Sequence, residues 1–195
     1  MYSYNPHSIL CKWSAKLALY FGFLLLANAA VAQAQTAKNA TSDALAKIVI
    51  NSPAPSISGN TFDKKPFQLS SLIGKVVVVM FWSTDCAVCR DQMPELRENI
   101  RGWADKPFEL VLVNVDKNIR DVETYNDIIS RSVPVKQRFI QLWAGDASYR
   151  DNVNLNQTPK NQLPLTLVLD QSGKVVAKHS GRIPAAWWDT IADLL

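Results

Sequence analysis

The sequence has few of the residues that build metal sites and nucleic-acid surfaces. Its 195 residues include three cysteines and two histidines, whereas structural zinc normally takes four Cys or His ligands. The lysines and arginines form no run, which argues against nucleic acid as a partner because such surfaces gather basic residues. No internal repeat is present, so a solenoid is excluded. The length suits one domain and an additional segment.

The N-terminal segment has the three parts of a secretory signal. Lys12 and Lys16 precede an apolar stretch at residues 17–32, and small residues follow up to Ala34 in two overlapping Ala-x-Ala patterns. Cleavage after Ala34 is one interpretation. An uncleaved membrane anchor is the other, because the apolar run approaches the length that spans a bilayer.

This segment divides the chain and limits its cysteine chemistry. Cys11 lies before the apolar run, where a thiol is badly placed for lipid attachment at a processed N-terminus. The remaining chain keeps Cys86, Cys89 and one histidine, His179, so a zinc site would need carboxylates or a second chain. Export to an oxidising compartment favours disulfide chemistry. We predict a signal peptide or anchor at 1–34, a linker at 35–52 and a single domain at 53–195.

Apolar periodicity predicts an α/β domain. Residues 76–82 are continuously apolar and rich in valine, as in a strand buried on both faces of a parallel sheet. A helix is predicted at 86–104, with Pro94 inside it, and a second buried strand at 109–116. Strand, helix and strand at this spacing form a right-handed βαβ unit. The apolar face of the helix comprises Cys89, Met93, Leu96, Ile100 and Trp103.

The rest of the chain completes a thioredoxin-like plan. Ser58-Gly59-Asn60 is a turn signal between short extended pieces and predicts a small N-terminal hairpin. The turn at 170–173 is so short that the strands on either side of it must pair antiparallel. We therefore predict a thioredoxin fold, in which helices flank a central mixed sheet, with a short N-terminal hairpin extension. The other predicted elements are a helix at 122–132, a short strand at 139–142, a polar connection to 162, strands at 165–169 and 174–178, and a helix at 187–195.

Cys86 and Cys89 lie three residues apart where the predicted strand gives way to the helix. Two cysteines at this spacing can close a small disulfide. The free N–H groups and the dipole of the first helical turn stabilise an anion, so we expect a lowered pKa for Cys86. The thiolate is the nucleophile in disulfide exchange. We assign Cys86 as the attacking cysteine and the more shielded Cys89 as the cysteine that resolves the mixed disulfide.

The pattern around these cysteines resembles the TlpA/ResA group of exported thioredoxin-like proteins. The match comprises the run from Leu72 to Thr84, the Cys86–Arg90 segment, Met93-Pro94, and Leu163-Pro164 through Asp170. The resemblance implies a dithiol reductase that faces the periplasm or a membrane and often serves cytochrome c maturation. It also implies that the bond before Pro164 is cis. This proline would lie against the cysteine pair and keep metals from binding to it.

Three departures from that group concern proton handling. Asp85 stands where the group has tryptophan, Gln92 where it often has glutamate, and Met80 where thioredoxins carry a buried aspartate. A carboxylate beside Cys86 disfavours the thiolate, and Arg90 could offset it. Our hypothesis is that Asp85 raises the pKa of Cys86 and takes over part of the proton transfer. The alternative is a solvated carboxylate of little effect.

Other aromatic and polar residues have plainer interpretations. We expect Trp82 to pack under the cysteine loop and His179 to lie on the surface. Of the adjacent Trp187 and Trp188, we expect one to pack and the other to be exposed.

The leading function is thiol–disulfide exchange with protein clients in the periplasm. We expect a monomer that needs no cofactor or metal, and a membrane or periplasmic electron donor that reduces its disulfide again. A peroxiredoxin-like peroxidase is a second enzymatic interpretation. Such enzymes carry threonine three residues before the reactive cysteine, where Ser83 stands, and a proline upstream, where this chain has Val79. A copper chaperone that uses the two soft thiolates is a non-enzymatic interpretation.

Overall fold

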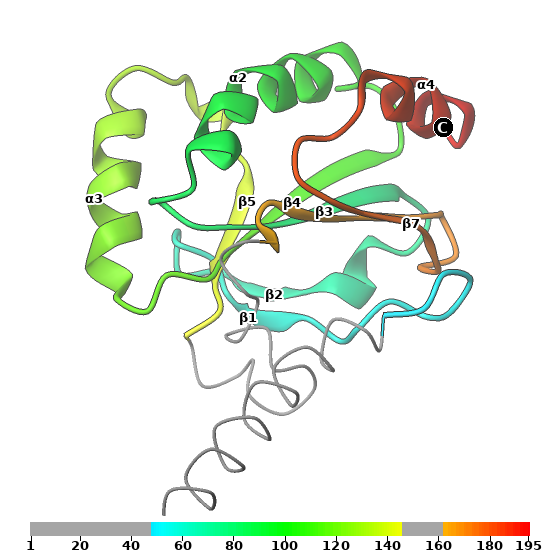
Figure 1. Cartoon of the computed structure of the whole chain (residues 1–195), viewed down its shortest axis with the longest axis horizontal. Coiled ribbons are helices and arrows are strands. Elements are labelled where there is room, and N and C mark those ends of the chain that lie inside the picture. The colour runs from blue at the N-terminus through cyan, green and yellow to red at the C-terminus, as the bar shows by residue number, and fades with distance from the viewer. Residues whose placement is uncertain (1–47, 146–161) are drawn as a thin grey trace, which may run out of the picture. The chain divides into compact units, whose positions relative to one another are not determined.

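The computed structural model describes residues 48–145 and 162–195, which form a mixed α/β domain (Figure 1). A five-stranded sheet has the order β5-β4-β3-β6-β7, and a separate two-stranded sheet pairs β1 with β2. The predicted central mixed sheet and its N-terminal hairpin are therefore confirmed. The elements are β1 (Ser58–Asn60), β2 (Pro66–Gln68), the 3-10 helix η1 (Leu69–Leu72), β3 (Val76–Trp82), α2 (Ala87–Gly102), β4 (Phe108–Asn114), α3 (Ile119–Ser130), η2 (Val135–Gln137), β5 (Ile140–Trp143), β6 (Leu165–Leu169), β7 (Val175–Ser180) and α4 (Ala185–Asp193).

Strand β3 lies at the centre of the sheet because every one of its residues is apolar. All seven are buried, between β4, which runs parallel to it, and β6, which runs antiparallel. The carboxyl ends of β3 and β4 and the amino end of β6 therefore share one edge of the sheet. The cysteine loop leaves β3 at this edge.

Helices and the hairpin cover the sheet from opposite sides. Figure 1 shows α2 and α4 above the sheet and the β1–β2 hairpin below it. The turn of the hairpin also protects β5, which is an edge strand: Thr61 forms a bridge to Leu142, and the Phe62 amide donates to the Gln141 carbonyl at 3.1 Å. Covering an edge strand removes a template for unwanted pairing.

Two sequence-based predictions of local structure are wrong. The segment Ser58–Asn60 is strand β1 itself, and the turn lies at residues 61–65, where Lys64 has a φ of 60°. Trp187 and Trp188 are both half-buried, because each side of α4 has a neighbour. The Trp187 ring packs on the half-buried His179, and the Trp188 ring packs on Trp103.

The end of the predicted linker already contacts the domain. The Asn51 amide donates to the Val175 carbonyl at 2.7 Å, and the Val175 amide donates to the Ser52 carbonyl at 2.9 Å. Ile48 is buried in the core. The predicted signal segment and most of the connection before residue 162 lie outside the described residues. In residues 48–145 and 162–195, no helix has the length and apolar character to cross a membrane.

Candidate redox site

Cys86 is the N-cap residue of α2 and is half-buried. Its backbone is extended, as is usual for an N-cap residue. Its Sγ atom accepts a hydrogen bond from the Cys89 amide at 3.1 Å. Cys89, one turn into the helix, is fully buried. The two sulfur atoms are joined in a disulfide of 2.11 Å. The structure thus places the first cysteine within reach of solvent and shields the second.

The N-terminus of α2 favours negative charge on Cys86, and the adjacent Asp85 carboxylate opposes it. The first turn of α2 holds no acidic side chain, and its amide groups point toward the N-cap, where the positive end of the helix dipole lies. The Cys89 amide already donates to the Cys86 sulfur. After reduction of the disulfide, the same amide would stabilise a Cys86 thiolate, the reactive form of the cysteine.

Hydrogen bonds fix the loop that leads from β3 into the helix. The Cys86 amide donates to the Ser83 carbonyl at 3.2 Å. The Ser83 hydroxyl donates to a carboxylate oxygen of Asp85, and the Arg90 guanidinium donates to the Thr84 carbonyl. Ser83, which stands in the position of the peroxidase threonine, thus directs its hydroxyl to Asp85.

Asp116 is a buried residue of this site that the sequence analysis missed. Its two carboxylate oxygens lie 3.2 and 3.1 Å from the Thr84 amide, and one of them also accepts from the Asn114 side chain at 2.9 Å. The Asp116 carbonyl accepts from the Trp143 indole at 2.8 Å. A signal was present in the sequence, because polar residues at the carboxyl end of a buried parallel strand lie beside the loop that follows its neighbour.

The other predicted site residues lie on or next to the strands and the helix that meet at the cysteine loop. Trp82 is fully buried and packs edge-to-face on Tyr125, with ring centroids 5.1 Å apart. Gln92 is also fully buried, and its Oε1 accepts from the Ile183 amide at 3.3 Å, so it ties α2 to the segment before α4. The bond before Pro164 is cis. Pro164 directly precedes β6, at the edge of the sheet from which the cysteine loop leaves. Its predicted position against the cysteine pair, where it would keep metals away, stays a prediction.

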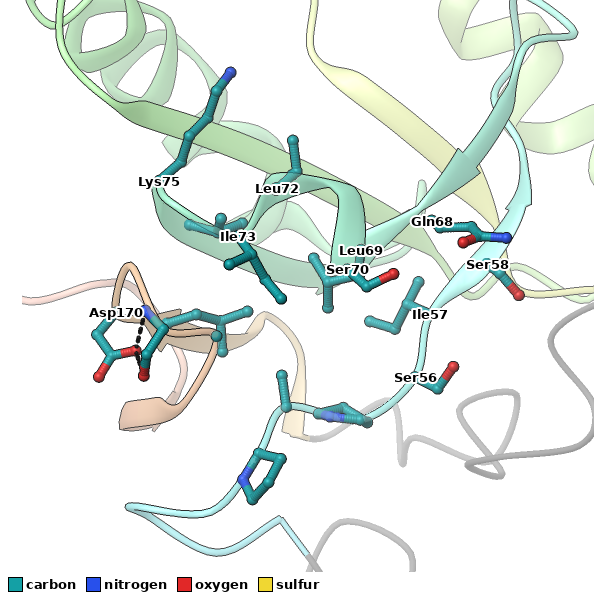
Figure 2. A pocket seen from close by; sticks show the side chains of 17 residues that line it. Ser56, Ile57, Ser58, Gln68, Leu69, Ser70, Leu72, Ile73, Lys75 and Asp170 are labelled. Atoms are coloured by element: carbon teal, nitrogen blue, oxygen red, sulfur yellow. Dashed lines mark hydrogen bonds between the residues drawn. The ribbon is translucent and has the colours of Figure 1, made fainter.

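A cavity of about 400 Å³ lies away from these residues. Figure 2 shows Ile57 and Leu69 at its apolar centre and Asp170 at its margin. None of its lining residues belongs to the cysteine loop or to α2. A hydrogen bond from the Ser172 hydroxyl, with amide donors from Ser172 and Lys174, holds the pKa of Asp170 below its ordinary value. This arrangement stabilises a turn, since Asp170 accepts from residues two and four positions later.

The part of the chain that the structure describes contains no group of three His, Cys, Asp or Glu side chains arranged to hold a metal ion. The two sulfur atoms of the described site are those of Cys86 and Cys89. They can be joined or separate, and the exchange between these states transfers two electrons.

Comparison with known proteins identifies relatives of the same chemistry. The family model described as AhpC/TSA family matches residues 50–185. The thiol-disulfide oxidoreductase ResA of Bacillus subtilis is 26% identical over 170 residues, which cover 87% of this chain and 88% of that protein. The thioredoxin-like protein YneN of the same organism is 29% identical over 131 residues, 66% of this chain and 69% of that one.

Solved structures give the same result for the fold. The thioredoxin domain of a thiol-disulfide oxidoreductase from Bacteroides vulgatus has a TM-score of 0.60 at 24% identity, covering 75% of this chain and 98% of that one. A thioredoxin-family thiol:disulfide interchange protein from Chlorobium tepidum has a TM-score of 0.56 at 26% identity, covering 74% and 96%. The chain belongs to the AhpC/TSA family, and within it is a ResA-like thiol–disulfide oxidoreductase with a thioredoxin fold.

Proposed function

We propose that the chain is an exported dithiol reductase that acts on disulfides of client proteins in the bacterial periplasm. The observation that carries this proposal is the asymmetry of the cysteine pair, with Cys86 half-buried at a helix N-cap and Cys89 fully buried behind it. The signal-like N-terminal segment supports export. The reducing direction is what the resemblance to the TlpA/ResA group implies.

The first step is attack of the Cys86 thiolate on one sulfur of a client disulfide. A bond forms between Cys86 and that sulfur, the client disulfide breaks, and the departing client sulfur leaves with the electron pair and takes a proton. The helix N-terminus stabilises the thiolate before the attack. The exposed side chain of Val88, between the cysteines, offers apolar surface to the client.

The second step releases the client. Cys89, deprotonated, attacks the Cys86 sulfur, the mixed disulfide breaks, and the second client sulfur leaves as a thiol. The client has gained two electrons and two protons, and the protein is left with the Cys86–Cys89 disulfide that the structure contains. A membrane-bound or periplasmic dithiol must then reduce this disulfide, with the protein acting as a monomer.

The finer role that we propose is the reduction of client cysteines before cytochrome c assembly. Haem attachment to such clients requires free thiols, and an oxidising compartment converts neighbouring thiols to disulfides. A reductase with an accessible Cys86 would reverse that oxidation. The bond before Pro164 is cis, at the edge of the sheet from which the cysteine loop leaves, and this proline would border the bound client.

The equilibrium potential of the Cys86–Cys89 couple tests the direction of the reaction. We expect a value near that of thioredoxin, which is about −270 mV, and well below that of a strong oxidant, which is about −120 mV. The potential is measured against glutathione or dithiothreitol buffers by trapping and counting free thiols. A value near that of the strong oxidant would contradict the proposed reductase.

Two cysteine variants test the order of the steps. Cys86→Ser should abolish reduction of a protein disulfide, whereas Cys89→Ser should accumulate a mixed disulfide between Cys86 and the client that is visible on a non-reducing gel. Cys11→Ser is the matched control and should keep full activity. Activity that survives in Cys86→Ser would refute the assignment of the attacking cysteine.

A further inference from the structure

A second cavity lies between α2, α3, β5 and the turn of the N-terminal hairpin. Its volume is about 650 Å³, within the range of about 300–1,000 Å³ that is typical of small-molecule sites. Aromatic side chains from separate elements line it, among them Phe62, Tyr125 and Phe139. Nothing in the proposed redox chemistry uses this cavity.

Arg97 presents an unused charge to this cavity. Its guanidinium lies over the Phe139 ring, 5.3 Å from the ring centroid, and its Nε atom is buried without a hydrogen-bond partner. In residues 48–145 and 162–195, no carboxylate forms an ion pair with it. Burying a charged donor is costly unless an acceptor meets it, so the position is suited to an incoming anion.

The neighbouring arginines differ from Arg97 in this respect. Arg138 also lines the cavity, but its guanidinium donates to the Ser130 carbonyl at 2.9 Å. Arg101, one turn further along α2, is exposed and pairs with Glu98. Arg97 is thus distinguished by its partial burial and by its lack of an acceptor among the described residues.

The remaining charges around the cavity limit the anion that it can accept. Three acidic side chains face four basic ones around the cavity: Asp63, Glu123 and Asp127 against Lys64, Lys65, Arg97 and Arg138. The excess of one positive charge favours a ligand with one negative charge, and the three carboxylates would repel a ligand with several. A single negative charge beside Arg97, carried on an apolar or aromatic body, satisfies both the unpaired guanidinium and the aromatic walls.

We propose that this cavity binds a small amphiphilic monocarboxylate, with its carboxylate on Arg97 and its apolar body against Phe139 and the adjoining walls. A guanidinium presents parallel N–H donors that match the two oxygens of a carboxylate. The position over an aromatic ring favours a planar ligand body beside it.

The cavity shares packing residues with the redox site but not its cysteines. Met93, one turn after Cys89 on α2, lines the cavity, as does Tyr125, which packs on Trp82. Neither Cys86 nor Cys89 lines the cavity, so the proposed ligand would leave Cys86 open to clients. Binding at Arg97 and disulfide exchange at Cys86 can consequently fail independently.

Calorimetric titration of the full, oxidised chain with 2-naphthoate tests the proposal. We expect saturable binding at one site, and binding of the neutral analogue 2-naphthalenemethanol that is weaker by at least about tenfold, because a charge-assisted hydrogen bond is lost. Arg97→Gln should weaken 2-naphthoate binding by at least about tenfold and remove the preference for the charged ligand. Arg101→Gln is the matched control and should bind like the wild type.

Disulfide-exchange activity should be unchanged in Arg97→Gln, and circular dichroism establishes that the variant is folded. If this variant does not fold, the preference of the wild type for 2-naphthoate over the neutral analogue decides the question, and Arg97→Lys should keep part of that preference. Absence of saturable binding up to millimolar 2-naphthoate would overturn the proposal. Equal binding of the charged and neutral ligands, or equal losses in the Arg97 and Arg101 variants, would also overturn it.

Discussion

Asp116 anchors the loop that carries the cysteines, and replacing it should affect both stability and exchange. Its carboxylate accepts from the Thr84 amide and from the Asn114 side chain. Asp116→Ala would leave both donors without this acceptor. The Asn114 side chain is fully buried, so its unpaired amide should cost about 1–3 kcal/mol. Water can repay part of the cost at the half-buried Thr84, and we expect a total loss of about 2–4 kcal/mol in the free energy of unfolding.

The same substitution should slow disulfide exchange by about tenfold or more, because small displacements of a reacting group lower rates steeply. Asp116→Asn should be milder on both counts, since its one remaining side-chain oxygen can still accept from Thr84. Urea unfolding of the oxidised protein gives the stability, and the rate of reduction of a protein disulfide gives the activity.

Asp105→Ala is the matched control, because Asp105 is exposed in the turn after α2. It should change the free energy of unfolding by less than about 0.5 kcal/mol. If Asp116→Ala behaved like this control in both measurements, the carboxylate would not be what holds the loop. If Asp116→Asn were as damaging as Asp116→Ala, the negative charge rather than the acceptor geometry would be responsible.

Three further substitutions probe ionisable positions. Asp85→Asn removes a charge beside Cys86, so the thiolate absorbance of the reduced protein should titrate with a lower pKa; an unchanged pKa would reject our hypothesis for Asp85. Gln92→Glu places a carboxyl group in a fully buried position, where burial raises the pKa, so the variant should lose more stability at pH 8 than at pH 5 in urea unfolding; equal losses would show that the carboxyl group is solvated. Asp170 has a lowered pKa in the folded chain, so its contribution is present above the unfolded value and disappears as pH falls through the folded one. Asp170→Asn keeps an acceptor for the turn but carries no charge, so its free energy of unfolding should fall below that of the wild type at pH 7, and the difference should shrink as pH falls and the wild-type carboxyl group takes up its proton; a pH-independent difference would contradict this reasoning.

Local sequence patterns were sufficient for the scaffold of the site. The continuous apolar run at 76–82 predicted β3, because a short run rich in valine is typical of a strand buried on both faces. Periodicity predicted α2, in which Cys89, Met93 and Leu96 are buried as expected. The apolar run and the helical periodicity together predicted that Cys86 lies at the N-terminus of this helix.

Contacts between distant residues could not be read in the same way. Asp116 meets Thr84 across 32 positions of sequence, and Gln92 meets Ile183 across 91. No local pattern records such pairings, because they depend on which strands become neighbours. The turn signal at Ser58–Asn60 was misplaced because pairing with β2 makes that segment a strand.

The sequence by itself determined where the two cysteines lie, between a buried strand and the first turn of a helix. Both elements follow from the spacing of apolar residues that are close together in the sequence. The tertiary structure decided what surrounds them. It brought Asp116 to the loop through the parallel pairing of β3 and β4, buried Gln92 under the segment before α4, and placed Arg97 at a cavity without an acceptor among the described residues. These features require the free energy of packing between distant segments, and that energy exists only once the sheet has assembled.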